Sequence, residues 1–116
     1  MKVRLSIVAL VAALSGVPAV SSADVASGTI NLVEMNPQVE SARVYLTGVT
    51  TMCTGSTSNF AYLTVFTDNS GHTADINYNG MVATLLTAKS LGTLVDIYST
   101  LDATTGYCHI TDIIMH

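Results

Sequence analysis

The chain has 116 residues, of which four are lysine or arginine and eight are aspartate or glutamate, so its net charge at pH 7 is −4. This length allows one domain with one hydrophobic core. The shortage of basic side chains argues against binding to nucleic acid or to an acidic membrane surface, because both attract positive charge.

The first 23 residues have the layout of a secretory signal peptide. Lys2 and Arg4 supply a positively charged start, and Leu5–Val17 is an apolar run of 13 positions that is interrupted only by small residues. This run is shorter than the roughly 18 residues that a membrane-spanning helix needs. We therefore expect the segment to be cleaved and the protein to be exported, either to a periplasm or out of the cell.

Small residues mark the expected cleavage site. Ser21-Ser22-Ala23 fits the small-residue rule and would make Asp24 the first mature residue, although cleavage after Ser21 or after Ala26 also fits. Cleavage would remove two of the four basic residues and none of the eight acidic ones. It would leave one domain over residues 24–116, with no membrane span and a net charge of −6.

Three segments in the first half of the mature domain have the composition of β-strands. They are Thr29–Met35, Ala42–Thr51 and Phe60–Thr67. Gly48 lies inside the second segment, where a glycine often marks a bulge or a bend. The third segment is apolar on both of its alternating faces, which predicts a central strand that is buried on two sides.

A polar turn follows these strands. Asp68–Gly71 contains turn-forming residues, and the run from Asp68 through His72 to Asp75 carries oxygen donors of the kind that hold Ca²⁺. The run lacks the alternating acidic residues and the distal glutamate of an EF-hand loop. We therefore interpret it as a solvated turn and expect no metal there.

The next segment has the periodicity of one helix of roughly 12 residues. Apolar residues recur at the spacing of a helix face, namely Met81, Val82, Leu85, Leu86 and Ala88. Asn77 or Asn79 is placed to cap the start, and Gly92 is placed to end the helix. The apolar face could pack on the domain itself or line a contact with a second subunit, and the sequence leaves both open.

Two more strands complete the domain, Thr93–Ser99 and Gly106–Met115, joined by Thr100–Thr105. The predicted order is thus strand, strand, strand, helix, strand, strand. A single helix between the third and fourth strands is typical of the OB-fold, a five-stranded Greek-key barrel. We predict this barrel in preference to a split α+β sheet, because closure removes the exposed edges of a small sheet.

The mature domain contains two cysteines, Cys53 and Cys108. An even pair in an exported protein predicts a disulfide, here closing a loop of about 55 residues, and two free buried thiols are the alternative. In the chain-entropy model such a loop contributes about 4 kcal/mol. The spacing matches no zinc pattern, so we expect neither a metal nor another cofactor.

Taken together, these elements resemble a family of exported OB-fold domains. The features that match are Cys53 after the second strand, the helix MVATLLTAKSLG (Met81–Gly92), the strand TLVDIYS that follows it, and Cys108 within GYCHITDIIM. The pattern is similar to the pentameric B subunits of bacterial A–B type toxins, including the subtilase-cytotoxin-like group. The resemblance implies a homo-oligomer with helices around a central pore, and binding to sugars of host glycoconjugates. It supplies no sugar-binding motif that can be placed on individual residues.

Tyrosine is the aromatic side chain that this sequence offers for sugar binding. Its ring can stack on a sugar while its hydroxyl hydrogen-bonds, although most tyrosines simply pack a core. Tyr45 and Tyr107 are the first candidates, because their neighbours in sequence are expected to point inward. Ser58 and Asn59, in the polar loop before the third strand, would complete a shallow site.

The residues give little support for catalysis. His109 and Asp112 are three apart in one strand and should point to opposite faces, His116 ends the chain, and no nucleophile-elbow motif accompanies the serines. We therefore predict a non-enzymatic exported binding domain that recognises a carbohydrate or a protein. A structural or protein-interaction domain of the envelope, with no small ligand, is the alternative, and a small exported enzyme comes third.

Overall fold

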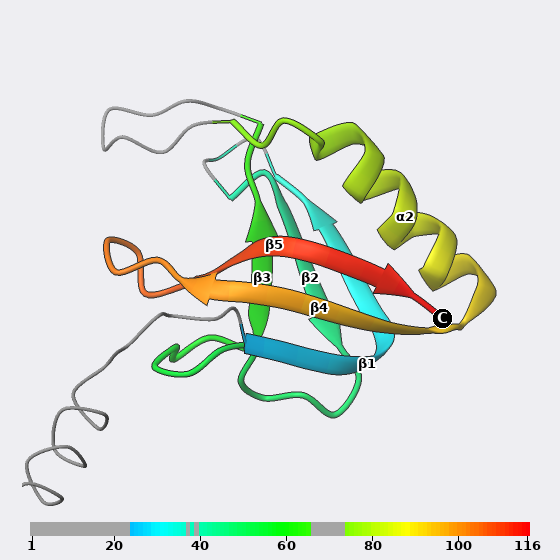
Figure 1. The fold of residues 1–116 in the computed structure, drawn as a ribbon, viewed down its shortest axis with the longest axis horizontal. Coiled ribbons are helices and arrows are strands. Elements are labelled where there is room, and N and C mark those ends of the chain that lie inside the picture. The colour runs from blue at the N-terminus through cyan, green and yellow to red at the C-terminus, as the bar shows by residue number, and fades with distance from the viewer. Residues whose placement is uncertain (1–23, 37, 39, 66–73) are drawn as a thin grey trace, which may run out of the picture.

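The computed structural model describes residues 24–36, 38, 40–65 and 74–116 (Figure 1). The expected signal peptide over residues 1–23, the turn at 68–71 and His72 lie outside the described residues. The elements are β1 (Asp24–Met35), β2 (Ala42–Leu46), β3 (Phe60–Leu63), α2 (Tyr78–Leu91), β4 (Leu94–Leu101) and β5 (Cys108–Met115). The described part of the chain is therefore mostly β with one helix, as the sequence predicts.

The five strands form one mixed sheet that closes into a ring in the order β1-β2-β3-β5-β4. Neighbouring strands are antiparallel except for β3 and β5, which run parallel. Closure depends on the long strand β1, whose first half pairs with β4 and whose second half pairs with β2. The register of β1 with β2 shifts between Ile30 and Leu32. Such an irregularity bends a strand, and here it lies where β1 passes from β4 to β2.

The hydrophobic core lies inside the ring, because alternate side chains of each strand point inward. On β2 and β4 the buried positions alternate with more exposed ones, and β3 is buried at all four of its residues. This confirms the prediction of a central strand buried on two sides. Leu85 and Ala88 of α2 are fully buried in the same core, and the helix covers one end of the ring (Figure 1).

The ends of α2 follow from single residues. Asn77 occupies the position before the first helical residue but makes no capping bond with its side chain. Gly92 adopts the left-handed conformation, with φ of 65°, and its N–H donates to the carbonyl oxygen of Lys89 at 3.2 Å. The predicted helix end at Gly92 is confirmed, because a residue without Cβ is the one that enters this conformation without strain.

Two glycines near opposite ends of α2 should respond oppositely to the same substitution. Gly80 lies within the helix, and a Cβ there would meet no atom within 4 Å, whereas Gly92 has a positive φ. We expect Gly80→Ala to raise the free energy of unfolding by about 0.5–1 kcal/mol, because alanine loses less backbone entropy on folding. Gly92→Ala should lower it by about 1–2 kcal/mol. Urea unfolding of both variants tests this prediction. A change of the free energy of unfolding in the same direction for both variants would contradict it.

Several strand boundaries differ from the prediction. β1 begins at Asp24 rather than Thr29, because its first six residues are held by pairing with β4 and not by an apolar pattern of their own. β2 ends at Leu46 rather than Thr51. Gly48, with φ of 75°, lies in the turn that ends this strand and not in a bend within it. A positive φ takes the backbone out of the extended region, and here it turns the chain after Leu46.

The other boundaries move by a few residues. β3 ends at Leu63, since the next backbone N–H, that of Thr64, donates to an Asp75 carboxylate oxygen at 2.7 Å. β4 and β5 start one and two residues later than predicted, and β4 continues to Leu101. No helix in the described segments is both long and apolar enough to cross a membrane.

Candidate functional site

The outward-facing side chains of four adjacent strands form two parallel rows, which we call the outer strip. Strand register places them side by side, since Glu34 pairs with Arg43, Arg43 with Tyr62, and Tyr62 with His109. These four residues make the polar row. Beside it, Leu32 pairs with Tyr45 and Tyr45 with Phe60, and Tyr107 follows. The aromatic row is therefore Leu32, Tyr45, Phe60 and Tyr107.

The aromatic row is a chain of ring contacts. The centroids of Tyr45 and Phe60 are 5.6 Å apart, and those of Phe60 and Tyr107 are 4.8 Å apart, with ring planes tilted by 54° and 51°. Such tilted pairs are the favoured geometry for aromatic rings. Phe60 is buried beneath its neighbours, while Tyr45 and Tyr107 are half-buried and remain partly open to solvent.

Arg43 lies where the two rows meet. Its guanidinium carbon is 4.5 Å from the centroid of Phe60 and 5.8 Å from that of Tyr107, within range of a cation–π interaction. The carboxylates of Glu34 and Glu40 approach the guanidinium nitrogens at 3.7 and 3.8 Å. Among the described residues its buried Nε has no hydrogen-bond partner. This Nε lies beneath the surface of the outer strip, and the two terminal guanidinium nitrogens are the donors that face the carboxylates.

Tyr62 fixes the loop that carries Tyr107. The Tyr62 hydroxyl donates to the Asp102 carboxylate at 2.8 Å, and that carboxylate also accepts from the Thr104 N–H at 2.9 Å. The backbone of Asp102 closes the same loop, because its N–H donates to the Tyr107 carbonyl and its carbonyl accepts from Gly106. Burial, followed by the bond to Asp102, raises the pKa of Tyr62 far above its usual value near 10.

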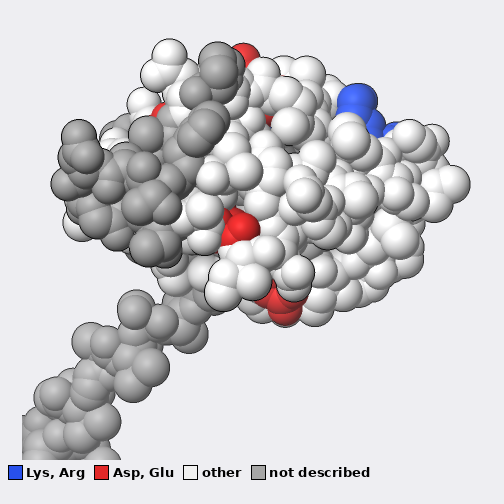
Figure 2. Space-filling model, turned by 90° about the horizontal axis from the view of Figure 1, so that it is seen from above, with Lys and Arg blue, Asp and Glu red and all other residues white. Residues whose placement is uncertain are grey.

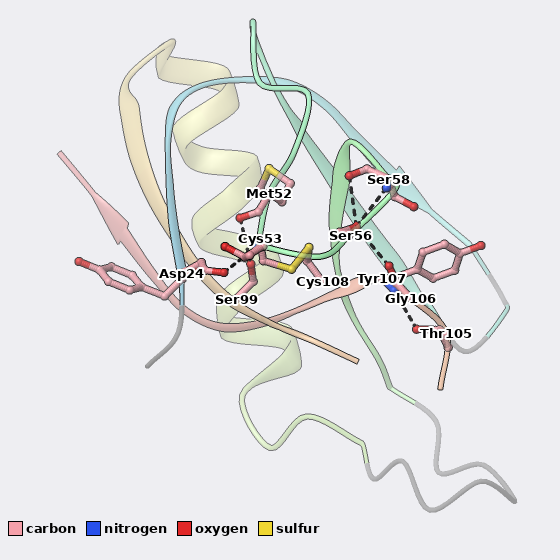
Figure 3. The surroundings of a disulfide bond; sticks show 12 residues. Asp24, Met52, Cys53, Ser56, Ser58, Ser99, Thr105, Gly106, Tyr107 and Cys108 are labelled. Carbon is pink, nitrogen blue, oxygen red and sulfur yellow. Dashed lines mark hydrogen bonds between the residues drawn. A yellow bond between two sulfur atoms is a disulfide. The ribbon is translucent and has the colours of Figure 1, made fainter. Parts of the chain in front are cut away.

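A disulfide joins this loop to the one before β3 (Figure 3). Cys53 and Cys108 are bonded with their Cα atoms 5.9 Å apart, and both are buried. This confirms the pairing predicted from the sequence. The Ser56 hydroxyl donates to the Gly106 carbonyl at 3.2 Å beside the bridge. Figure 3 shows Tyr107 pointing away from the disulfide, so the bridge anchors its backbone and leaves its ring in the outer strip.

His109, at the end of the polar row, pairs with a residue from outside the strip. Its Nε2 lies 2.9 and 3.1 Å from the two carboxylate oxygens of Asp75, and its ring centroid is 5.1 Å from that of Tyr62. Asp112 instead pairs in register with Tyr98 on β4. The histidine thus ties the segment before α2 to the sheet.

The four predicted binding residues lie at one end of the ring. Tyr45 and Tyr107 belong to the same row, joined through Phe60. Ser58 is half-buried in the loop before β3, where its N–H donates to the Ser56 hydroxyl at 3.0 Å. Asn59 is exposed and directly precedes Phe60. The structure thus brings the two tyrosines together, and the two loop residues directly precede Phe60, whose ring lies between those of the tyrosines.

The residues that link the two tyrosines were not among the predicted binding residues. They are Arg43, Phe60 and Tyr62, of which Phe60 and Tyr62 were expected to be buried strand residues. The alternation of ARVYL and FAYL does place Arg43 with Tyr45, and Phe60 with Tyr62, on common faces. The cross-strand register that brings these faces together depends on tertiary structure.

Acidic side chains lie at several separate places on the surface, whereas basic side chains are few. Figure 2 shows one face with separate acidic patches and a single basic one at its edge. Arg43 and Lys89 are the basic residues of the described segments, and two carboxylates beside Arg43 offset its charge. The outer strip therefore offers no continuous positive surface.

Comparisons of this chain with protein-family models, with curated proteins and with solved structures found no match. The function of the outer strip is therefore inferred from its own geometry.

Removing the Tyr62 hydroxyl should loosen the loop from Asp102 to Tyr107. We expect Tyr62→Phe to lower the free energy of unfolding by about 1–2 kcal/mol, because it removes a hydrogen bond to a carboxylate. Below pH 10 both the folded and the unfolded state keep the phenolic proton. Above pH 10 the unfolded state releases it first, so stability falls as the pH rises.

Unfolding measured between pH 8 and about pH 11 tests this effect. Tyr62→Phe should remove part of the alkaline loss of stability. Tyr78→Phe is the matched control, since burial alone raises the pKa of Tyr78. Tyr78→Phe should remove less of the stability loss at high pH than Tyr62→Phe does. An equal effect of the two variants would contradict a contribution of Asp102 to the raised pKa of Tyr62.

Proposed function

We propose that the ring of strands is an OB-fold and that this chain is an exported, non-enzymatic domain that binds carbohydrate on its outer strip. The observation that carries this proposal is the alignment of an aromatic row with a polar row across β1, β2, β3 and β5. The parallel pairing of β3 with β5 and the helix between β3 and β4 support the OB-fold.

A sugar ring fits this chemistry because its C–H face is apolar and its rim carries hydroxyl groups. Tyr45 and Tyr107 offer partly exposed rings for stacking, and both carry hydroxyls, of which that of Tyr45 donates to Glu34 at 3.3 Å. Glu34 supplies acceptors and Arg43 supplies donors in the adjacent row. Donors and acceptors side by side suit a hydroxyl, which is both at once.

The outer strip is held in shape before any ligand arrives. The disulfide, the bond from Tyr62 to Asp102 and the bond from Ser56 to Gly106 fix the loop that carries Tyr107. A preformed surface loses less entropy on binding, which favours weak ligands such as sugars. The same strands of an OB-fold bind oligonucleotides in other proteins, but here Glu34 and Glu40 flank Arg43 and would repel phosphate.

Assembly into a ring of subunits, such as a pentamer, belongs to the same proposal through the resemblance to toxin B subunits. Leu86 and Leu91 on α2 remain exposed after Leu85 and Ala88 have packed on the sheet. Exposed apolar side chains of this kind favour a contact between subunits. Light scattering measures the mass, and a strict monomer would remove oligomerisation from the proposal.

A glycan array probed with the purified, disulfide-closed protein tests carbohydrate binding. We expect Tyr45→Ala and Tyr107→Ala each to weaken the strongest signal by about tenfold, equivalent to ~1.4 kcal/mol. Tyr98→Ala is the matched control, because Tyr98 is also half-buried but lies on β4, opposite Val25 and Asp112. It should leave the signal unchanged.

Two results would contradict the proposal. One is a silent array with a folded wild-type protein, which would favour a structural or protein-interaction domain of the envelope. The other is an array signal that survives Tyr45→Ala and Tyr107→Ala in full. Thermal unfolding of each variant separates a lost contact from a lost fold.

A further inference from the structure

We propose that a groove between α2 and β5 is a second binding site, which takes an extended peptide segment with alternating apolar and basic side chains. This site lies apart from the outer strip and does not depend on the carbohydrate proposal. It rests on four observations: the shape of the groove, an unpaired stretch of strand, an unfilled glycine and the charge of the lining.

The groove consists of two adjoining hollows with volumes of about 390 and 330 Å³. They share Asn77 and Met81 at the start of α2, and they run along β5 from His109 to Ile113. Figure 1 shows the helix diverging from β5 toward the end where these residues lie. Together the two hollows follow consecutive residues of β5, which suits an extended chain more than a compact ligand.

One wall of the groove is a strand without a partner on that side. β3 ends at Leu63 and pairs with β5 only at Cys108 and His109. From Ile110 to Met115, β5 pairs with β4 alone among the described residues. The Ile113 N–H donates to the Asp112 carboxylate at 2.9 Å instead of to a strand. An extended peptide can add to such an edge through main-chain hydrogen bonds.

The opposite wall of the groove is α2, where Gly80, which has no side chain, lines the second hollow. A Cβ there would meet no atom within 4 Å, so the packing of the domain itself does not require glycine. Glycine inside a helix costs about 0.5–1 kcal/mol relative to alanine. We interpret the missing side chain as room for an occupant close to the helix backbone.

The lining selects the side chains of that occupant. Met81 and Ile113 give the groove apolar walls. Asp112 is exposed at its rim, Asp75 lines it while bonded to His109, and the lining contains no lysine or arginine. Ile76, next to the rim, is fully exposed. A strand that places apolar residues on one face and lysine or arginine on the other would match both features.

Peptide display on the disulfide-closed protein tests this proposal, with random ten-residue peptides as the probe. We expect enriched sequences that alternate apolar and basic residues. Their binding should shift the backbone amide NMR signals of residues 110–114. Gly80→Trp, which fills the groove, should weaken binding by at least about tenfold. Ala83→Trp adds the same bulk at an exposed position of α2 that does not line the groove, and it should change affinity by less than about twofold.

Asp112→Asn tests the charge separately, because asparagine keeps an oxygen for the Ile113 N–H. It should weaken basic peptides by about threefold at low salt and by less at high salt. The proposal is overturned if no peptide sequence is enriched more strongly on the wild-type protein than on the Gly80→Trp variant. It is also overturned if Gly80→Trp and the wild type bind equally, or if the shifted amides lie in the outer strip. Unfolding curves confirm that each variant is folded.

Discussion

Replacing both cysteines together, as Cys53→Ala and Cys108→Ala, is expected to lower the free energy of unfolding by about 4 kcal/mol. The bridge spans 55 residues, so it removes many conformations from the unfolded chain. Small domains are stable by only about 5–15 kcal/mol in total, so this loss should bring the protein close to unfolding at 37 °C. The bridge should therefore contribute about as much stability as a large side chain buried in the core.

Guanidinium unfolding of the double variant, followed by circular dichroism, measures this loss. Ser56→Ala is the matched control, because it keeps the disulfide and removes the hydrogen bonds of the Ser56 hydroxyl with Gly106 and Ser58 beside the bridge, which should cost about 1–2 kcal/mol. Wild-type protein with the disulfide reduced should behave like the double variant. A double variant within about 1 kcal/mol of the wild type would show that the closed ring is stable without the bridge.

The second large effect is expected at the contact between the helix and the ring. Leu85 is fully buried, whereas Leu86, its neighbour in sequence, is 47% exposed. Leu85→Ala should cost about 2–5 kcal/mol, since it leaves a cavity among core residues as well as losing transfer energy. Leu86→Ala should cost less than about 1 kcal/mol in an isolated subunit.

Urea unfolding of the two leucine variants at low protein concentration gives this comparison directly. Equal losses would mean that α2 is not packed on the ring as described. Repeating the measurement at high concentration adds a test of assembly. A cost of Leu86→Ala that appears only at high concentration would indicate that the exposed leucine lies in a subunit contact.

Local signals in the sequence predicted the features that single residues determine. Gly92 ends the helix because its conformation excludes a Cβ, and the apolar spacing before it places Leu85 and Ala88 on the buried face. The two apolar faces of β3 predicted its burial on both sides. Cys53 and Cys108 were the only two cysteines, so their pairing followed once export was expected.

Features that depend on register between distant strands could not be predicted in this way. Asp24–Gly28 has small and polar residues without strand periodicity, and only its pairing with β4 makes it extended. The stacking of Arg43 on Phe60 needs the β2–β3 register and the loop that brings Tyr107 over the same ring. No spacing within either segment contains this information.

The way in which β1 closes the ring also affects how fast the protein folds. Asp24 pairs with Ser99, and β3 pairs with the last strand, so the first and last parts of the domain must meet before the core is sealed. Contacts this distant in sequence make folding slow, because loop closure precedes the gain from packing. A chain that cannot close until its final strand is available stays unfolded while it is still being made. If the protein is exported as we expect, that delay would keep it in a form that can be threaded across a membrane.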